Sequence, residues 1–222
     1  MNYKAIIFDF DGVLFDSEKI HLQACNQVSH TLGFTLSKEE YFQHYVGLSD
    51  QEMLNLILKN KNLSCTIDQS QALRRNKMDA YQAIINQYES LDGVAGVKGF
   101  LESNKELINS FAICSGGTRE EVIATLNKLE HGEIKQYFKY IITVDDVSAG
   151  KPSPEGYLLT AQRLNILPQH CLVIEDTPVG ITAARNAGMD VIGITTSHPK
   201  SALKQATFIA DDYAEINSWI NS

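Results

Sequence analysis

Short apolar segments alternate with amphipathic helical segments along most of this chain, and this alternation constrains the fold more than any other feature. Each apolar segment reads as a buried strand because it is short and bounded by turn residues. Strands that alternate with helices are typical of a parallel, doubly wound α/β sheet. The sequence therefore predicts such a core. The expected strands are residues 5–10, 111–115, 140–144, 171–175, 191–195 and 207–210.

One stretch, residues 16–88, breaks the alternation because it carries helical patterns and no convincing strand. We therefore expect an inserted α-helical cap domain at 16–88 and an α/β catalytic core made of 1–15 and 89–222. The insert directly follows the first strand, where it could cover a site as a lid. Helix starts are indicated by Ser17 and by two capping boxes, Ser37-x-x-Glu40 and Ser49-x-x-Glu52.

Two carboxylates, Asp9 and Asp11, follow the apolar run Ala5–Phe8, and Gly12 supplies a sharp turn after them. Ligands of open α/β sheets bind outside the carboxyl ends of the strands. Charges left unpaired in a protein interior are costly. These two acids must therefore bind a cation, shift in pKa or take part in chemistry.

Three further strand ends carry polar residues that would meet at the same edge of the sheet. Ser115 and Gly116 precede a capped helix, and a hydroxyl beside a helix N-terminus makes an anion site. Lys151 precedes a helix that begins with proline, and Glu175-Asp176 ends a fourth strand. Carboxylates combined with a lysine and a serine suit a phosphate held through Mg2+, which prefers hard oxygen ligands.

These residues resemble the four motifs of the haloacid dehalogenase superfamily of phosphotransferases. Asp9-Phe10-Asp11-Gly12-Val13 matches the first motif, Ser115 the second, Lys151 the third and Glu175-Asp176 the fourth. The helical insert is similar to the small cap of the β-phosphoglucomutase-like subfamily, which also contains many sugar-phosphate phosphatases. The resemblance implies a Rossmann-like core and covers essentially the whole chain.

The resemblance also implies a role for each motif residue. Asp9 would attack phosphorus and form an aspartyl-phosphate, and Asp11 would serve as general acid and then general base. Ser115, the N–H of Gly116 and Lys151 would hold the phosphoryl group. The metal Mg2+ would be bound by Asp9, the backbone carbonyl of Asp11, and Asp176. Glu175 would support the site or reach the metal through water.

Three cap residues resemble substrate-side features of the subfamily: His21 matches a histidine, Gly47 lies in a matching cap loop, and Lys77 falls near a cap lysine. Ordinary helix packing for His21 and a solvated helix face for Lys77 are the competing interpretations. The loop Gly47-Leu48-Ser49 matches the subfamily, but Asp50 stands where an arginine that grips the second phosphate of a bisphosphate is expected. An acid at this position disfavours a mutase and favours a hydrolase of monophosphates.

The sequence thus predicts a Mg2+-dependent phosphatase that acts on a small phosphorylated metabolite, a sugar phosphate being favoured, through an aspartyl-phosphate. One alternative is a sugar-phosphate mutase similar to β-phosphoglucomutase. A metal-free dehalogenase is less favoured, because that chemistry usually lacks an acid at the position of Asp11. A non-catalytic phosphate-binding regulator is disfavoured by the complete motif set.

The composition of the chain indicates which binding partners and which cellular location to expect. The formal net charge of −8 disfavours binding to nucleic acid or to an anionic membrane. No apolar run approaches the roughly 18 residues of a membrane span, and Asp9 comes too early for a signal peptide. The four cysteines are scattered, which favours a reducing cytoplasm without disulfides. We expect a monomer or weak homodimer whose partner is a small phosphate ester.

Overall fold

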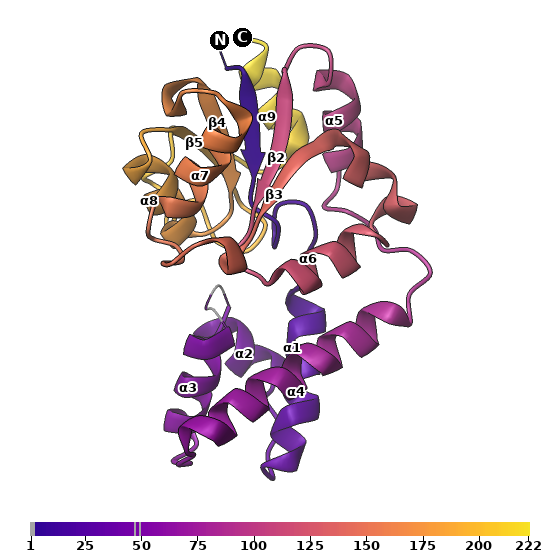
Figure 1. The fold of residues 1–222 in the computed structure, drawn as a ribbon, viewed down its shortest axis with the longest axis vertical. Helices are drawn as coiled ribbons and strands as arrows, with labels where there is room; N and C mark the ends of the chain where they lie inside the picture. Colours follow the sequence, from indigo (N-terminus) through magenta and orange to yellow (C-terminus); the bar gives the residue numbers. More distant parts are fainter. Residues whose placement is uncertain (1–2, 47, 49) are drawn as a thin grey trace. The chain divides into compact units, whose positions relative to one another are not determined.

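The structure is a computed structural model that describes residues 3–46, 48 and 50–222, and it divides into two compact units. One unit, here the core unit, comprises Met1–Asp16 and Ser90–Ser222, and the other, here the helical unit, comprises Ser17–Glu89. Figure 1 draws the ribbon of both units in sequence colours. No helix among the described residues is long and apolar enough to cross a membrane.

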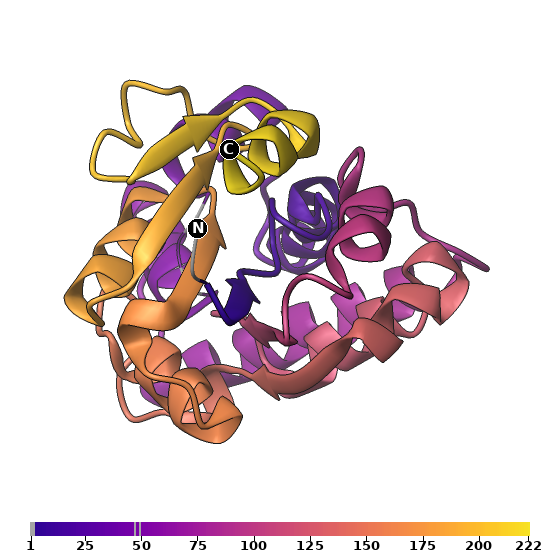
Figure 2. The same cartoon turned by 90° about the horizontal axis from the view of Figure 1, so that it is seen from above.

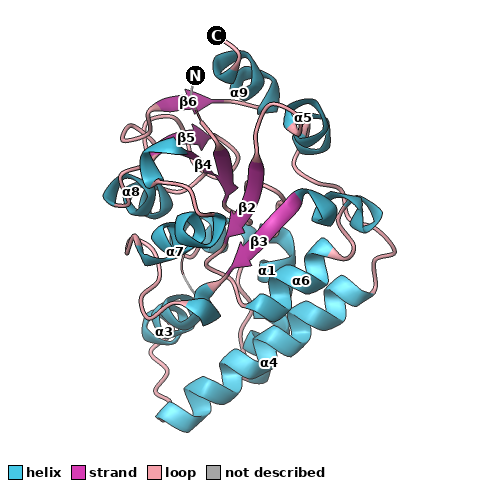
Figure 3. Ribbon diagram, turned by 45° about the horizontal axis from the view of Figure 1, so that its top comes forward, coloured by secondary structure: helices cyan, strands magenta, loops and turns pink. Residues whose placement is uncertain are grey.

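The core unit is built on a six-stranded parallel sheet in the order β3-β2-β1-β4-β5-β6 (Figure 3). The chain winds outward from β1 in one direction through β2 and β3, then returns to β4 and winds outward the other way. The predicted doubly wound α/β class is therefore confirmed. The strands are β1 (Ala5–Phe8), β2 (Ser110–Cys114), β3 (Phe138–Ile142), β4 (Cys171–Glu175), β5 (Asp190–Ile194) and β6 (Phe208–Ala210).

Helices cover both faces of this sheet, and they are seen on either side of it in Figure 2. Helices α7 (Glu155–Leu164) and α8 (Pro178–Asn186) pack against the sheet and each other on one face. On the other face, α5 (Val97–Asn104) packs against α9 (Tyr213–Ile220). The central strands β1 and β4 are buried along their whole length, as strands covered by helices on both faces should be. The remaining helical segments of the core unit are α6 (Arg119–Leu126), η1 (Glu130–Tyr137), η2 (Val144–Asp146) and η3 (Pro168–His170).

The strand order brings the polar strand ends together. Strand β1 lies between β2 and β4, and Phe8 pairs with Ile113 on one side and with Ile174 on the other. The backbone N–H of Asp9 extends this ladder by donating to the carbonyl of Ile174 at 3.0 Å. The residues that follow β1, β2 and β4 are thus neighbours at the point where the winding direction reverses, which is where open α/β sheets bind ligands.

The helical unit contains α1 (Glu18–Thr31), α2 (Lys38–His44), α3 (Asp50–Asn60) and α4 (Ile67–Asn86). Helix α4 packs against both α1 and α3. The Ser37 half of the predicted capping box is confirmed, because the Ser37 side chain accepts the N–H of Glu40. Ser17 occupies the N-cap position of α1 without a side-chain capping bond. The box predicted at Ser49 lies outside the described residues.

Candidate active site

Asp9 is the first polar residue after β1 and is buried, with 6% of its surface exposed. One carboxylate oxygen, Oδ1, accepts a hydrogen bond from Lys151 Nζ at 2.5 Å. Burial raises the pKa of Asp9 to about 7; the charge of Lys151 opposes this shift, and the charges of Glu175 and Asp11 add to it. Asp9 is therefore an acid whose ionised form depends on neighbouring positive charge.

Lys151 bridges two carboxylates, because the same Nζ lies 2.5 Å from Asp9 Oδ1 and 2.5 Å from Glu175 Oε1. Burial acts to lower the pKa of Lys151, but the two carboxylates outweigh it and raise the pKa well above its usual range. The ammonium also lies 5.2 Å from the ring centroid of Tyr157. Lys151 is consequently a fixed positive charge at the edge of the sheet.

Glu175 is fully buried, and protein donors occupy both of its oxygens. Its Oε1 accepts from Lys151 and from the hydroxyl of Tyr157. Its Oε2 accepts from the backbone N–H of Asp176 and from both the N–H and the hydroxyl of Thr177. Glu175 is thus a satisfied acid that holds Lys151 in place.

Asp176 presents its two oxygens differently. Its Oδ2 accepts a hydrogen bond from Ser197 Oγ at 2.5 Å, whereas its Oδ1 is buried and has no hydrogen-bond partner in the described structure. Burial, followed by the charges of Glu175 and Asp9, raises the pKa of Asp176 well above its usual range. A buried acceptor without a donor is costly unless something electropositive binds it.

The acids of this edge form a candidate cation site. Carboxylate oxygens of Asp9, Glu175 and Asp176 lie within 4.8 Å of one another. Lys151 offsets only part of their negative charge, and hard carboxylate oxygens select a cation such as Mg2+. Because the oxygens of Glu175 are already occupied, Asp9 and Asp176 fit best as the direct ligands. This donor set, with Oδ1 of Asp176 unpartnered among the described residues, fits the expected metal.

Gly12 explains how the loop after β1 reaches the acids. Its φ of +73° lies in the left-handed region, and a Cβ on it would lie 1.8 Å from Asp176 Oδ2. The preceding residue, Asp11, is half-buried, and its charge contributes to the raised pKa of Asp9. The loop therefore brings Asp11 to the edge that carries the acid cluster.

Ser115 is buried immediately after β2 and opens the loop into α6. Its Oγ accepts the backbone N–H of Gly117 at 2.9 Å, which shapes the loop around Gly116. Thr118 and Glu121 form a capping box at the start of α6, with both of its hydrogen bonds present. Backbone N–H groups at the start of α6 thus lie directly after β2, as an anion site requires.

In the helical unit, Lys77 is completely buried and its Nζ lies 2.6 Å from Asp50 Oδ1 and 2.8 Å from His21 Nδ1. The interpretation of Lys77 as part of a solvated helix face is therefore wrong: its helix is covered by α1 and α3, and the amine is ion-paired. His21 also stacks on Tyr81, with ring centroids 4.7 Å apart. Gly47 lies outside the described residues.

Two participants were not expected from the sequence. Tyr157 sits inside α7, where an apolar residue at helical spacing reads simply as core. Ser197 lies in an irregular loop after β5, and no sequence pattern separates it from an ordinary loop serine. Both are recognisable only because the fold places their hydroxyl groups against Glu175 and Asp176.

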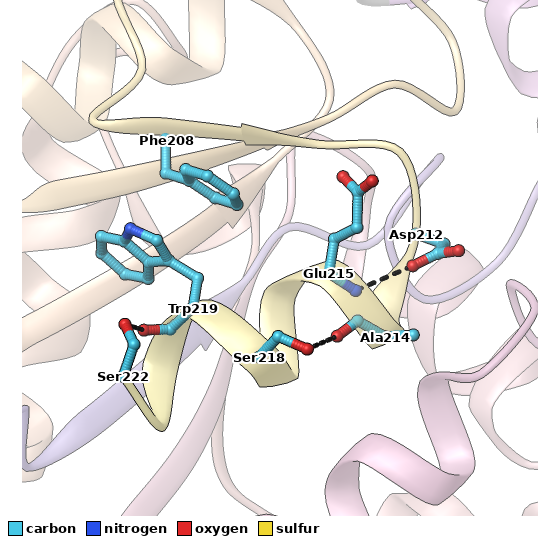
Figure 4. Close-up of a pocket in the computed structure, with 7 residues that line it drawn as sticks. All are labelled: Phe208, Asp212, Ala214, Glu215, Ser218, Trp219 and Ser222. Atoms are coloured by element: carbon cyan, nitrogen blue, oxygen red, sulfur yellow. Dashed lines mark hydrogen bonds between the residues drawn. The ribbon is translucent and has the colours of Figure 1, made fainter.

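A surface hollow of about 480 Å³ lies elsewhere on the core unit, between α9 and the start of β6 (Figure 4). Trp219 stacks on Phe208 there, with ring centroids 5.3 Å apart. None of the clustered acids lines this open hollow, so we assign the chemistry to the edge of the sheet. Its lining residues are Phe208, Asp212, Ala214, Glu215, Ser218, Trp219 and Ser222.

Comparison with known proteins identifies a family whose matched region contains this site. Residues 6–194 match the family model of the haloacid dehalogenase-like hydrolases. The chain belongs to this family, which confirms the membership predicted from its four motifs. The matched range contains the clustered acids, Lys151 and Ser115.

Individual relatives within the family give a more specific comparison. A phosphorylated carbohydrates phosphatase of Thermotoga maritima is 27% identical over 210 residues, which cover 93% of each chain. A fructose-1-phosphate phosphatase of Escherichia coli is 29% identical, covering 86% of this chain and 96% of the relative. The crystal structure of β-phosphoglucomutase from Clostridium difficile superposes with a TM-score of 0.84 at 26% identity and covers 99% of this chain and 100% of that chain. The predicted enzyme class, a phosphoric monoester hydrolase of the haloacid dehalogenase type, is confirmed, as is the likeness to the β-phosphoglucomutase-like subfamily.

Proposed function

We propose that this chain is a Mg2+-dependent phosphatase that hydrolyses a small phosphorylated metabolite, a sugar phosphate, through an aspartyl-phosphate intermediate. The observation that carries the proposal is the buried cluster of Asp9, Glu175 and Asp176 around Lys151, in which Asp176 Oδ1 has no partner among the described residues. Bound Mg2+ would lower the repulsion between the attacking carboxylate and the phosphoryl dianion. Asp9 and Asp176, with the backbone carbonyl of Asp11, would hold it.

Asp9 attacks phosphorus, because it is the carboxylate that the sheet places at the switch point beside a fixed ammonium. Lys151 has two functions in this step. It favours the ionised, nucleophilic form of Asp9, whose pKa burial raises, and it stabilises negative charge on the transferring phosphoryl group. Glu175 and Tyr157 keep Lys151 in place, so the charge does not have to reorganise during the reaction.

Asp11 protonates the leaving oxygen and then removes a proton from the water that hydrolyses the aspartyl-phosphate. Ser115 and the N–H of Gly116 bind phosphoryl oxygens at the start of α6. Asp11→Asn is expected to slow both half-reactions by about 100-fold or more, within the range typical of general acid–base catalysis. Unchanged single-turnover kinetics in this variant would remove Asp11 from the mechanism.

The helical unit, as the cap domain, selects the substrate in this proposal. His21, Gly47 and Lys77 contact the part of the substrate that does not react. The ion pair with Asp50 offsets the positive charge that Lys77 could offer to a second phosphate, which supports a monophosphate whose remaining part is uncharged. The names of the phosphatase relatives support phosphorylated carbohydrates in the same way. We place this activity in the cytoplasm, with a small phosphate ester and neither nucleic acid nor membrane as partner.

The proposal is tested by phosphate release from a panel of phosphorylated metabolites, with Mg2+ and with EDTA. Release that depends on Mg2+ from one or a few sugar phosphates is the expected result. The panel should contain hexose 1-phosphates, hexose 6-phosphates and a sugar bisphosphate, because the bisphosphate reports on the charge balance around Lys77. Release that is equal in EDTA would contradict the role of the acid cluster.

A sugar-phosphate mutase is the second candidate, favoured by the likeness to β-phosphoglucomutases and by the contact of His21 with Lys77 in the helical unit. The same panel separates the two functions. A mutase would interconvert glucose 1-phosphate and glucose 6-phosphate without net phosphate release. A phosphatase would release phosphate from either glucose phosphate and would not form the other isomer.

A further inference from the structure

We propose that Ser197 and His198 form a directed hydrogen-bond chain that positions Asp176 for metal binding; this inference rests on the proposed function. Ser197 Oγ lies 2.5 Å from Asp176 Oδ2, 3.2 Å from the Asp176 carbonyl and 2.8 Å from His198 Nδ1. All three residues belong to the core unit. Ser197 and His198 lie in the loop after β5, outside the four motifs.

Hydrogen counting gives the chain its direction. Asp176 must be ionised to bind a cation, and an ionised carboxylate only accepts hydrogen bonds, so the single hydroxyl hydrogen of Ser197 goes to Asp176. Ser197 Oγ must then accept from His198, which assigns the proton of a neutral imidazole to Nδ1. The histidine thus orients the serine, and the serine orients the carboxylate. Neither Ser197 nor His198 is a catalytic residue in this proposal; both are positioning residues.

The hydrogen bonds of Ser197 fix the plane of the Asp176 carboxylate. One oxygen then faces Ser197, and the other remains available to a cation. On the Oδ2 side, the carboxylate is held by Ser197, and the close approach of the Gly12 backbone leaves no room for a Cβ. On the other side, Oδ1 is buried without a donor in the described part of the chain and belongs to the acid cluster. Because the two oxygens of an ionised carboxylate are equivalent, a half turn changes nothing, but a rotation of the carboxylate out of this plane would break the bond to Ser197. The hydrogen bond therefore holds the ionised carboxylate so that its free oxygen faces the cation, which is a common role of residues behind metal ligands.

The test measures metal binding without substrate or turnover. Binding of Mn2+, which prefers the same carboxylate ligands, is followed by the electron paramagnetic resonance signal of the free ion. Ser197→Ala is expected to weaken binding by about 10- to 100-fold, the usual range for a lost partner of a metal ligand. Ser197→Thr keeps the hydroxyl and should restore most of the affinity. Near-native Mn2+ affinity in a folded Ser197→Ala protein would overturn the proposal.

His198 and a neighbouring threonine provide the internal checks. His198→Leu should weaken Mn2+ binding less than Ser197→Ala does, and His198→Asn, whose amide can replace Nδ1–H, should recover part of the loss. Thr195→Val is the matched control, because the hydroxyl of Thr195 lies in the same loop but bonds to Asp211. Native affinity is expected there. Equal losses in Thr195→Val and Ser197→Ala would show that only the integrity of the loop matters and would overturn the proposal.

The outcomes also separate this inference from the proposed phosphatase. If the native protein binds Mn2+ but hydrolyses no phosphate ester, the proposed function fails and the Ser197 series still decides the positioning role. If hydrolysis is Mg2+-dependent but Ser197→Ala binds Mn2+ normally, only the positioning role fails. If the native protein binds no divalent cation, both fail. Should Ser197→Ala not fold, as judged by circular dichroism, native Mn2+ affinity in His198→Leu would overturn the chain.

Discussion

The two units each contain a lysine held against a carboxylate, but their charge balance differs. In the core unit, Lys151 bridges Asp9 and Glu175, and the third acid, Asp176, lies within the same cluster. In the helical unit, Lys77 pairs with the carboxylate of Asp50, and its Nζ also contacts a histidine nitrogen. In the described contacts, the lysine of the core unit therefore faces an excess of carboxylates, whereas Lys77 and Asp50 form a balanced pair of opposite charges.

This difference in charge determines what each cluster can bind. Uncompensated carboxylates in a buried place require a cation or a proton, which explains both the raised pKa of Asp9 and Asp176 and the fit to a divalent metal. A balanced pair has no such requirement, and its polar atoms suit hydroxyl groups better than a second phosphate. We accordingly propose that the chemistry belongs to the core unit and the selection of the substrate to the helical unit.

The largest expected effect is the loss of turnover in Asp9→Asn. The amide keeps the shape of the side chain but removes the nucleophile, so we expect kcat to fall by about 10⁴-fold or more, as when covalent catalytic residues are removed. Because a buried charge also disappears, the folded state should be at least as stable as the native protein in EDTA. Steady-state phosphate release and urea denaturation check the two parts.

A covalent trap sharpens this first prediction. In the native protein, denaturation during turnover should leave an acid-stable phosphoryl group on the chain, detectable by mass spectrometry on the peptide that contains Asp9. Asp9→Asn should carry none. Labelling of the variant, or turnover within tenfold of the native enzyme, would remove Asp9 as the nucleophile.

The second effect compares the two lysines directly by replacing each with methionine. Lys151→Met leaves two buried carboxylates facing each other and should destabilise the core unit by about 3–5 kcal/mol, the usual cost of breaking a buried pair. It should also lower kcat by about 100-fold or more, because a preorganised charge at the phosphoryl group is lost. Urea denaturation at pH 7 and steady-state kinetics with Mg2+ measure these effects.

Lys77→Met is the matched substitution. Asp50 is left without its lysine, so a loss of stability is expected here too, but kcat for the best substrate should change by less than tenfold because this lysine has no part in phosphoryl transfer. If Lys77→Met abolished kcat as completely as Lys151→Met, the division between chemistry and selection would be wrong.

The third effect is a pH dependence that belongs to the core cluster alone. The pKa of Asp9 is about 7 in the folded state and near its ordinary value of about 4 in the unfolded chain. Between these values the folded state binds more protons, so stability in EDTA is highest near pH 4 and falls as the pH rises toward 7. A decrease of a few kcal/mol is expected, because a pKa difference of one between the folded and unfolded states corresponds to about 1.4 kcal/mol.

Two conditions should weaken this dependence of stability on pH. Saturating Mg2+ stabilises the ionised carboxylates, and Asp9→Asn removes one of the titrating groups. Urea midpoints at pH 5 and pH 8, with EDTA and with Mg2+, provide the measurement. Stability that rises between these pH values in EDTA would show that Lys151 compensates the acids more fully than the charge balance indicates.

The strands and the acid cluster of the core unit could be predicted from the sequence. The strands were predictable because buried parallel strands are continuous apolar runs, and Ala5–Phe8 and Cys171–Glu175 lie within the predicted ranges. The acids and Lys151 were predictable because topology alone brings strand ends together. The structure places Asp9, Lys151, Glu175 and Asp176 in one cluster, while the roles assigned to them stay predictions.

Contacts made by tertiary packing were not predictable in this way. Lys77 reads as exposed because helical spacing does not reveal that α1 and α3 both cover its helix. Ser197 reads as a loop residue because no periodicity links residue 197 with residue 176. The parallel pairing of β4 with β5 brings the residues after both strands to the same edge of the sheet, and their separation along the chain leaves no local signal.

The smallest effect should come from Asp50→Asn, which tests the balanced pair itself. The substitution removes the negative charge of Asp50 from beside Lys77, so the helical unit would gain attraction for a second phosphate. We expect KM for a sugar bisphosphate to fall by about three- to tenfold, while KM for a sugar monophosphate changes by less than about twofold. Less than about 2 kcal/mol of interaction energy is needed for this, since tenfold corresponds to about 1.4 kcal/mol.

Asp79→Asn is the control for Asp50→Asn, because Asp79 is exposed on α4 of the same unit and changes the net charge equally. Equal shifts of KM in both variants would indicate a general electrostatic attraction that salt screens. A shift confined to Asp50→Asn, and unaffected by moderate salt, would instead locate the selection at the buried pair. Unchanged KM values in Asp50→Asn would separate the pair from the substrate and leave it a purely structural contact of the helical unit.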